Sequence, residues 1–177
     1  IPHFIGEHML YKKIRAKFGG KIRAGISGGG ALQKDIEMFY RAIGFNLLEG
    51  YGLTEAAPVT SVNLSKKCRS GNIGPALSSF EVRIAELDEN NQPVPGTSLK
   101  PGKKGVLMVR GRQVMKGYYN NPEATAAVID AEGWLNTGDL AMISYDKELK
   151  IVGRAKDTIV LLGGENIEPA VIEKAVN

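Results

Sequence analysis

A tyrosine between two glycines, followed closely by a hydroxyl and a carboxylate, is the stretch of this sequence best suited to chemistry. The apolar run that starts at Leu47 ends in Gly50-Tyr51-Gly52-Leu53-Thr54-Glu55. Glycines on both sides free the backbone from the usual φ restriction and admit a flat ligand, to which the tyrosine can offer a ring face. Thr54 could contact a phosphate oxygen, and Glu55 could hold a hard cation. The alternative is a strand and tight turn with a surface tyrosine.

A second glycine cluster, Gly28-Gly29-Gly30, follows a short strand-like stretch. It matches neither of the common phosphate-binding glycine motifs, since no Gly-Lys-Ser/Thr follows it. Three residues without a β-carbon would, however, let a planar group lie flat against the backbone. A flexible turn is the alternative interpretation.

Two later residues could bind a sugar. Asp139 ends the segment 133–139, and a carboxylate can accept two hydroxyl hydrogen bonds, as vicinal ribose hydroxyls require. Arg154 follows another strand-like stretch and offers a permanent, forked donor to ribose or phosphate oxygen. An Asx turn after a buried tryptophan is the alternative for Asp139. Residues 163–169 could form a hinge or a plain turn between strands.

The elements that must position these residues can be read from periodicity. Helices are expected over 9–18, 36–43 and 122–129, and strands near 21–26, 47–49, 80–84, 105–111, 140–144, 148–152 and 158–162. Strands that alternate with helices indicate a parallel sheet, whose ligands lie beyond the carboxyl ends of the strands. The triglycine segment and Tyr51 both follow such ends, so their loops should face one pocket.

Composition indicates a soluble globular protein, with 43% apolar and 24% charged residues in 177. The net charge of +4 comes largely from a basic run over 12–23, which is more typical of a solvated helix face than of a nucleic-acid or membrane patch. The single Cys68 rules out an intrachain disulfide. Asn63-Leu64-Ser65 fits a glycosylation acceptor, but no signal peptide is visible. We expect a cytoplasmic protein, with peripheral contact to anionic lipid as an alternative.

Four motifs together resemble the adenylate-forming acyl-CoA synthetases, in wording most similar to bacterial long-chain fatty-acid CoA ligases. They are Ser-Gly-Gly-Gly-Ala-Leu, Glu-Gly-Tyr-Gly-Leu-Thr-Glu, Gly-Trp-Leu-x-Thr-Gly-Asp, and Gly-Arg-Ala-Lys-Asp with Gly-Gly-Glu-Asn-Ile-Glu-Pro. The resemblance implies an α/β fragment of that fold. Residues 1–58 would belong to a parallel α/β subdomain, 59–152 to a β-rich, barrel-like subdomain, and 153–177 to the hinge and start of a small α+β lid domain.

The resemblance also implies a role for each candidate residue. The adenine would lie against the triglycine loop and stack on Tyr51, and the ribose would be held by Asp139 and Arg154. Two residues would be catalytic: Thr54 at the α-phosphate and Glu55 with magnesium. Lys156 matches the position about which the lid rotates, and residues 163–166 match a loop that swings toward the site. The assigned nucleotide contacts are Gly28, Gly29, Gly30, Tyr51, Gly52, Thr54, Asp139 and Arg154.

In the implied reaction, a fatty carboxylate attacks the α-phosphate of ATP, pyrophosphate leaves, and coenzyme A then displaces AMP. The alternatives are a carrier protein as acceptor, or a non-catalytic nucleotide-binding or interaction module. The family's phosphate loop and late catalytic lysine lie outside these boundaries, and Gly153 stands where the family usually has an acid. The sequence therefore predicts an inactive fragment of a longer enzyme, with AMP affinity near millimolar, or about −4 kcal/mol. Exposed strand edges predict self-association.

Overall fold

The computed structural model describes residues 10–64, 69–157, 159–160 and 166–167. Cys68 and most of the expected swinging loop, residues 163–165, lie outside the described part. No helix among the described residues has the length and apolar character to span a bilayer.

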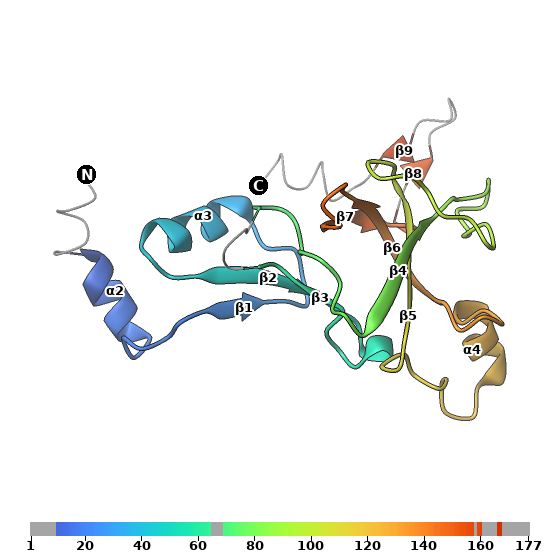
Figure 1. The fold of residues 1–177 in the computed structure, drawn as a ribbon, viewed down its shortest axis with the longest axis horizontal. Coiled ribbons are helices and arrows are strands. Elements are labelled where there is room, and N and C mark those ends of the chain that lie inside the picture. Colours follow the sequence, from blue (N-terminus) through green and yellow to red (C-terminus); the bar gives the residue numbers. More distant parts are fainter. Residues whose placement is uncertain (1–9, 65–68, 158, 161–165, 168–177) are drawn as a thin grey trace.

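A three-stranded sheet forms the first half of the described chain. Strand β1 (Gly25–Ser27) pairs in parallel with β2 (Leu47–Tyr51), and β3 (Ser61–Val62) pairs antiparallel with β2. The helix α3 (Lys34–Ala42) connects β1 to β2 and lies over one face of this pair (Figure 1). The parallel strand pair predicted from the alternation of strands and helices is therefore confirmed.

The basic segment forms a short helix, α2 (Lys12–Lys17). Gly19 and Gly20, both with positive φ, end it, as the sequence predicts. The ring of Phe18 packs against Phe45, with centroids 5.2 Å apart, and the Arg15 guanidinium donates to the carbonyl oxygen of Ile43. These contacts attach α2 to the end of α3.

The apolar stripe of α3 is only partly covered. Ile43, just beyond the helix, is fully buried, whereas Ile36 and Phe39 are exposed. The carboxylate Glu37 is buried instead and pairs with Arg41 one turn later. Periodicity thus identifies the helix correctly, but the described residues do not cover its whole apolar side.

A four-stranded antiparallel sheet in the order β4-β5-β6-β7 forms the second half. Its strands are β4 (Phe80–Ala85), β5 (Gly105–Gly111), β6 (Leu135–Ile143) and β7 (Leu149–Arg154). Before β6 comes α4 (Pro122–Val128), whose N-cap Asn121 side chain accepts from the Ala124 N–H. Beyond β7, β8 (Ile159–Val160) pairs with β9 (Asn166–Ile167). The α/β architecture with a β-rich second part is confirmed, while the subdomain boundaries after 58 and 152 stay predictions.

The two sheets share a core. Ile84, Leu107 and Leu149 are among the fully buried residues of the larger sheet's main cluster. Tyr51 and Leu53, from the end of β2, pack against this same cluster. The carboxyl end of the parallel pair is therefore placed directly on the antiparallel sheet.

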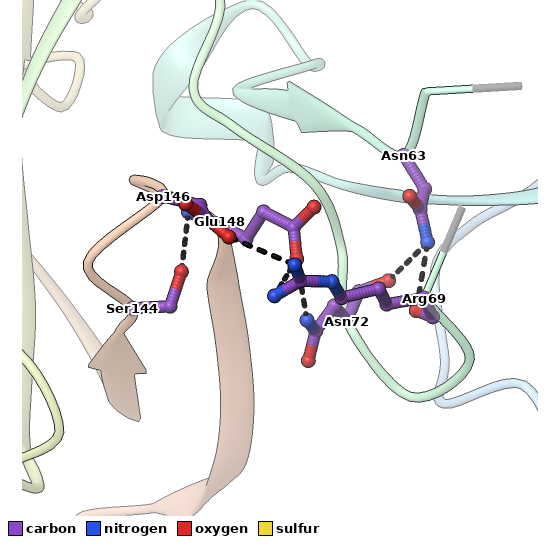
Figure 2. Close-up of polar contacts among 6 residues, drawn as sticks. All are labelled: Asn63, Arg69, Asn72, Ser144, Asp146 and Glu148. Carbon is purple, nitrogen blue, oxygen red and sulfur yellow. Dashed lines mark hydrogen bonds and ion pairs between the residues drawn. The ribbon is translucent and has the colours of Figure 1, made fainter. Parts of the chain in front are cut away.

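A polar cluster also links the segment after β3 to the hairpin between β6 and β7 (Figure 2). The buried Asn63 amide donates to the carbonyl oxygens of Arg69 and Asn72, at 3.1 and 2.8 Å. The Asn72 amide in turn donates to Glu148 at 2.9 Å. The amide of Asn63 is therefore buried and used inside the fold rather than presented at the surface.

Candidate functional site

Three of the predicted ligand-binding residues meet where the sheets join. The hydroxyl of Tyr51 donates to Oδ2 of Asp139 at 2.5 Å, and Nε of Arg154 donates to Oδ1 at 3.0 Å. Tyr51 and Asp139 are 88 residues apart in sequence. The alternative interpretation, a tight turn with a surface tyrosine, therefore does not describe Tyr51 fully. Its ring packs on the core of the larger sheet and its hydroxyl bonds to Asp139.

An irregularity in β6 explains how Asp139 reaches this point. Val106 of β5 faces Leu140, but Met108, two residues on, faces Asn136, so four residues of β6 span two of β5. Such a bulge bends the strand and turns a side chain toward a new direction. Gly138 takes a positive φ within it, and Asp139 becomes the register partner of Arg154 on β7. Asp139 thus lies inside β6, which begins before the strand expected near 140–144, and the alternative of an Asx turn does not describe its position.

The two donors to Asp139 lie in different surroundings. Asp139 is only 7% exposed. Burial, followed by the charge of Asp139, raises the pKa of Tyr51 above its ordinary value, so the phenol remains a neutral donor. The hydrogen bond to Asp139 raises the pKa of Arg154, whose side chain is 68% exposed. The buried carboxylate of Asp139 therefore accepts one hydrogen bond from a largely enclosed side chain, Tyr51, and one from a solvent-exposed side chain, Arg154.

Two cavities meet at Gly52 and Leu53. One, of about 350 Å³, is lined by Gly28, Gly29, Tyr51 and Thr54 on the side of the parallel strands. The other, of about 480 Å³, is lined by Glu55, Asp139, Arg154 and Lys156. All the predicted site residues except Gly30 therefore line one of two adjoining cavities, while their roles as ligand contacts stay predictions.

The glycines differ in why they are needed. Gly52 does not have a positive φ; a β-carbon there would lie 1.6 Å from the carbonyl oxygen of Pro58. Gly50 has no positive φ either, so the expectation that the glycines beside Tyr51 free φ is wrong for both. Gly52 instead allows two backbone segments to approach. Gly29 has a φ of +83°, and β-carbons at Gly29 and Gly30 would meet nothing within 4 Å. Gly29 and Gly30 therefore present open backbone, which a planar ligand could cover.

Thr54 and Glu55 lie in a short 3-10 helix, η2 (Thr54–Ala56), directly after β2. The hydroxyl of Tyr118 donates to Oε1 of Glu55 at 2.9 Å, and this bond raises the pKa of Tyr118. The described residues contain no group of three or more metal-binding side chains. A single carboxylate suits Mg²⁺, which proteins commonly bind through one or two carboxylates together with substrate phosphates. The donor set thus fits a cation that arrives with a nucleotide.

Sequence reasoning missed two supporting residues. Glu49, buried in β2, accepts the N–H of Leu32 at 3.0 Å and so fixes the end of the triglycine loop. A carboxylate inside an otherwise apolar strand was a usable signal for it. Tyr118, the partner of Glu55, comes from a loop between β5 and α4 in which no sequence pattern marks it.

Together, a parallel strand pair ending in open glycine backbone, an aromatic ring, a buried carboxylate and a second carboxylate beside it at adjoining cavities suit a protein that binds a nucleotide. Comparison with known proteins agrees. A family model described as AMP-binding enzyme matches residues 5–119. The chain belongs to this family, and its relatives place it among the adenylate-forming acyl-CoA synthetases.

Two curated relatives and one crystal structure illustrate the similarity. The chloroplastic long-chain-fatty-acid–[acyl-carrier-protein] ligase AEE15 of Arabidopsis thaliana is 42% identical, over 98% of this chain and 24% of its own length. The long-chain-fatty-acid–CoA ligase FadD15 of Mycobacterium bovis is 37% identical, over 97% and 26%. ATP-bound MatB from Rhodopseudomonas palustris superimposes with a TM-score of 0.77 at 33% identity, over 89% of this chain and 30% of that one. The chain thus spans about a quarter of the length of these curated relatives.

Proposed function

We propose that a longer protein containing this chain is an ATP-dependent fatty acyl-CoA ligase, and that this chain supplies its nucleotide site. The contact of Tyr51 and Arg154 with one buried carboxylate, Asp139, carries the proposal. This contact brings an aromatic ring, a carboxylate that could accept a diol and the guanidinium of Arg154 together beside two cavities. The similarity to FadD15 and to ATP-bound MatB supports the choice of reaction and nucleotide.

In this proposal the chain positions the nucleoside. The open backbone of Gly28 to Gly30 and the ring of Tyr51 cover the adenine, while Asp139 accepts the ribose hydroxyls. The Arg154 guanidinium, already paired with Asp139, donates to ribose oxygen. The contribution of these residues is binding and orientation, since none is placed to form a covalent intermediate.

The proposed reaction has two steps. A fatty carboxylate attacks the α-phosphorus of ATP and pyrophosphate leaves; the thiol of coenzyme A then attacks the acyl carbon and AMP leaves. Thr54 donates to an α-phosphate oxygen, and Glu55 holds Mg²⁺. The bound ion would neutralise phosphate charge as it develops. Lys156, exposed beside Arg154 in the larger cavity, is the proposed pivot of the lid.

The acceptor of the acyl group has a specific alternative. AEE15, whose name specifies an acyl-carrier-protein ligase, is 42% identical to this chain, compared with 37% for FadD15. Transfer to a carrier protein is therefore the second candidate function, and consumption of coenzyme A distinguishes the two.

The experiment is an assay of the full-length protein with ATP, Mg²⁺ and palmitate, with coenzyme A or acyl carrier protein added separately. We expect palmitate-dependent pyrophosphate release, acyl-CoA formation, and loss of both in Asp139→Ala. No palmitate-dependent pyrophosphate release would reject the proposal and leave a non-catalytic nucleotide-binding module. The isolated chain should show no turnover and bind AMP near millimolar, which calorimetry can check.

We further propose that the full-length protein is cytoplasmic. Cell fractionation would test this, and flotation of the purified protein with anionic liposomes at low and high salt would test contact of α2 with a membrane surface. Size-exclusion chromatography of the chain would test its self-association.

A further inference from the structure

Glu55 is held by one loop through both its backbone and its side chain. This loop, residues 112–121, connects β5 to α4. The N–H of Met115 donates to the carbonyl oxygen of Glu55 at 2.8 Å, and the Tyr118 hydroxyl donates to its Oε1 at 2.9 Å. The orientation of this carboxylate at the end of the first sheet is thus set from the second sheet.

Tyr118 is itself fixed at its base. Its N–H donates to Oγ1 of Thr125 in α4 at 2.9 Å, and its carbonyl oxygen accepts from the Asn121 N–H at 3.2 Å. Oγ1 of Thr125 donates to the carbonyl oxygen of Asn121, which closes the turn. The phenol therefore projects from an anchored backbone toward Glu55.

The Tyr118 bond uses only one oxygen of the carboxylate. Among the described residues, none donates a hydrogen bond to Oε2 of Glu55. Glu55 and Tyr118 both line the 480 Å³ cavity that also contains Asp139 and Arg154. Glu55 therefore has an oxygen without a hydrogen-bond donor among the described residues and lies at a cavity that also contains Asp139 and Arg154.

We propose that Tyr118 is a positioning residue for Glu55, holding its carboxylate so that Oε2 can bind the divalent cation of the bound nucleotide. This inference rests on the proposed function. Carboxylates that bind metal ions are commonly oriented by hydrogen bonds from neighbouring groups, and loss of such a partner typically weakens metal affinity by about 10- to 100-fold. Without Tyr118, the flexible glutamate would have to be ordered by the cation itself.

The competing explanation is that the Tyr118 hydroxyl only docks its loop on η2. Docking alone would affect nucleotide binding equally with and without a divalent cation. A positioning role predicts an effect confined to the part of ATP affinity that depends on the cation.

The experiment measures ATP dissociation constants of the full-length protein by calorimetry, in saturating Mg²⁺ and in EDTA, with no fatty acid present. The dissociation constant in EDTA divided by the constant in Mg²⁺ reports how much the cation contributes to ATP affinity. In Tyr118→Phe we expect this ratio to fall by about tenfold while the constant in EDTA stays unchanged. Tyr119→Phe is the matched control, because it removes one hydroxyl from the neighbouring side chain, which is 93% exposed.

A double-mutant cycle with Glu55→Gln completes the test. Glu55→Gln should lower the ratio, and Tyr118→Phe should add nothing in that background. An unchanged ratio in Tyr118→Phe, or an equal loss of affinity in EDTA and in Mg²⁺, would overturn the inference. Failure of the proposed function would be recognised separately, because the wild-type protein would then neither bind ATP nor release pyrophosphate with palmitate.

Discussion

At the scale of single residues, the site is organised around the carboxylate of Asp139. One donor, Tyr51, is largely enclosed and packs on the core, whereas the other, Arg154, lies mostly in solvent. A hydrogen bond to a charged acceptor in a buried setting contributes more than an exposed ion pair. The two donors should therefore have different effects on stability.

Removal of the Tyr51 hydroxyl should destabilise the chain measurably. Tyr51→Phe keeps the ring but takes one donor from a buried carboxylate, so we expect the free energy of unfolding to fall by about 1.5–3 kcal/mol. Urea denaturation followed by circular dichroism measures the change. Tyr145→Phe, at an exposed position, is the control and should leave stability unaltered. Equal stability of both variants would show that the Tyr51–Asp139 bond contributes nothing net.

The same bond predicts a pH dependence. Because the pKa of Tyr51 is higher in the folded chain than its ordinary value of about 10, the stabilisation is fully present below pH 10 and decreases as the pH rises further. The stability difference between wild type and Tyr51→Phe should thus be constant from about pH 7 to 9 and shrink in more alkaline solution. Urea titrations at several pH values would measure it; a difference that grows above pH 10 would contradict the assignment.

Arg154→Ala should behave differently. Since the guanidinium is well solvated, its loss should change the free energy of unfolding by less than about 1 kcal/mol. In the full-length protein the same substitution should weaken AMP binding, as measured by calorimetry. A large loss of stability would instead make Arg154 a structural residue.

At the scale of elements, the sequence predicted which segments form strands better than where side chains point. Strand β5 was predicted with its observed bounds, and the loops after β1 and β2 do line one cavity. The sequence placed this strand only near 140–144, with an Asx turn as the alternative for Asp139, whereas β6 begins at Leu135. A bulge depends on the register between β5 and β6, and this register cannot be read from a single sequence. The same reason hid the pairing of Asp139 with Arg154.

The glycines of these loops provide a test of element packing. Gly52→Ala places a methyl group against the backbone of Pro58, so we expect a loss of at least about 3 kcal/mol in the free energy of unfolding, or failure to fold. Gly30→Ala meets no neighbouring atom and should change stability by less than about 1 kcal/mol. Urea denaturation of both variants measures the contrast. Similar losses in both would mean that loop flexibility, rather than close approach, is the reason for the glycines.

At the scale of the whole molecule, the site exists only while the two sheets remain together. Besides the shared core, the polar cluster of Asn63, Asn72 and Glu148 joins them (Figure 2). The N–H groups of Ile73 and Leu149 bond across the same junction. No sequence pattern predicted this cluster, because it joins segments that are more than 70 residues apart and the glycosylation triplet at Asn63 does not point to such a contact.

Asn63→Ala should loosen this junction. It removes two hydrogen bonds, so we expect a loss of about 1–3 kcal/mol in stability and faster hydrogen exchange at the amides of Ile73 and Leu149. Exchange followed by NMR measures both amides. Asp146→Asn, which removes only an exposed ion pair with Arg69, is the control and should leave their exchange rates unaltered. Unchanged protection in Asn63→Ala would show that the core alone joins the sheets.

The only tryptophan of the sequence, Trp134, is nearly buried at the start of β6, with the guanidinium carbons of Arg83 and Arg110 lying 4.3 and 4.6 Å from its ring centroid. Its fluorescence therefore reports on the antiparallel sheet alone and is silent about the strands that carry the triglycine loop. An emission change on denaturation that precedes or follows the loss of far-ultraviolet ellipticity would reveal that the two halves of the proposed nucleotide site separate one after the other rather than at once.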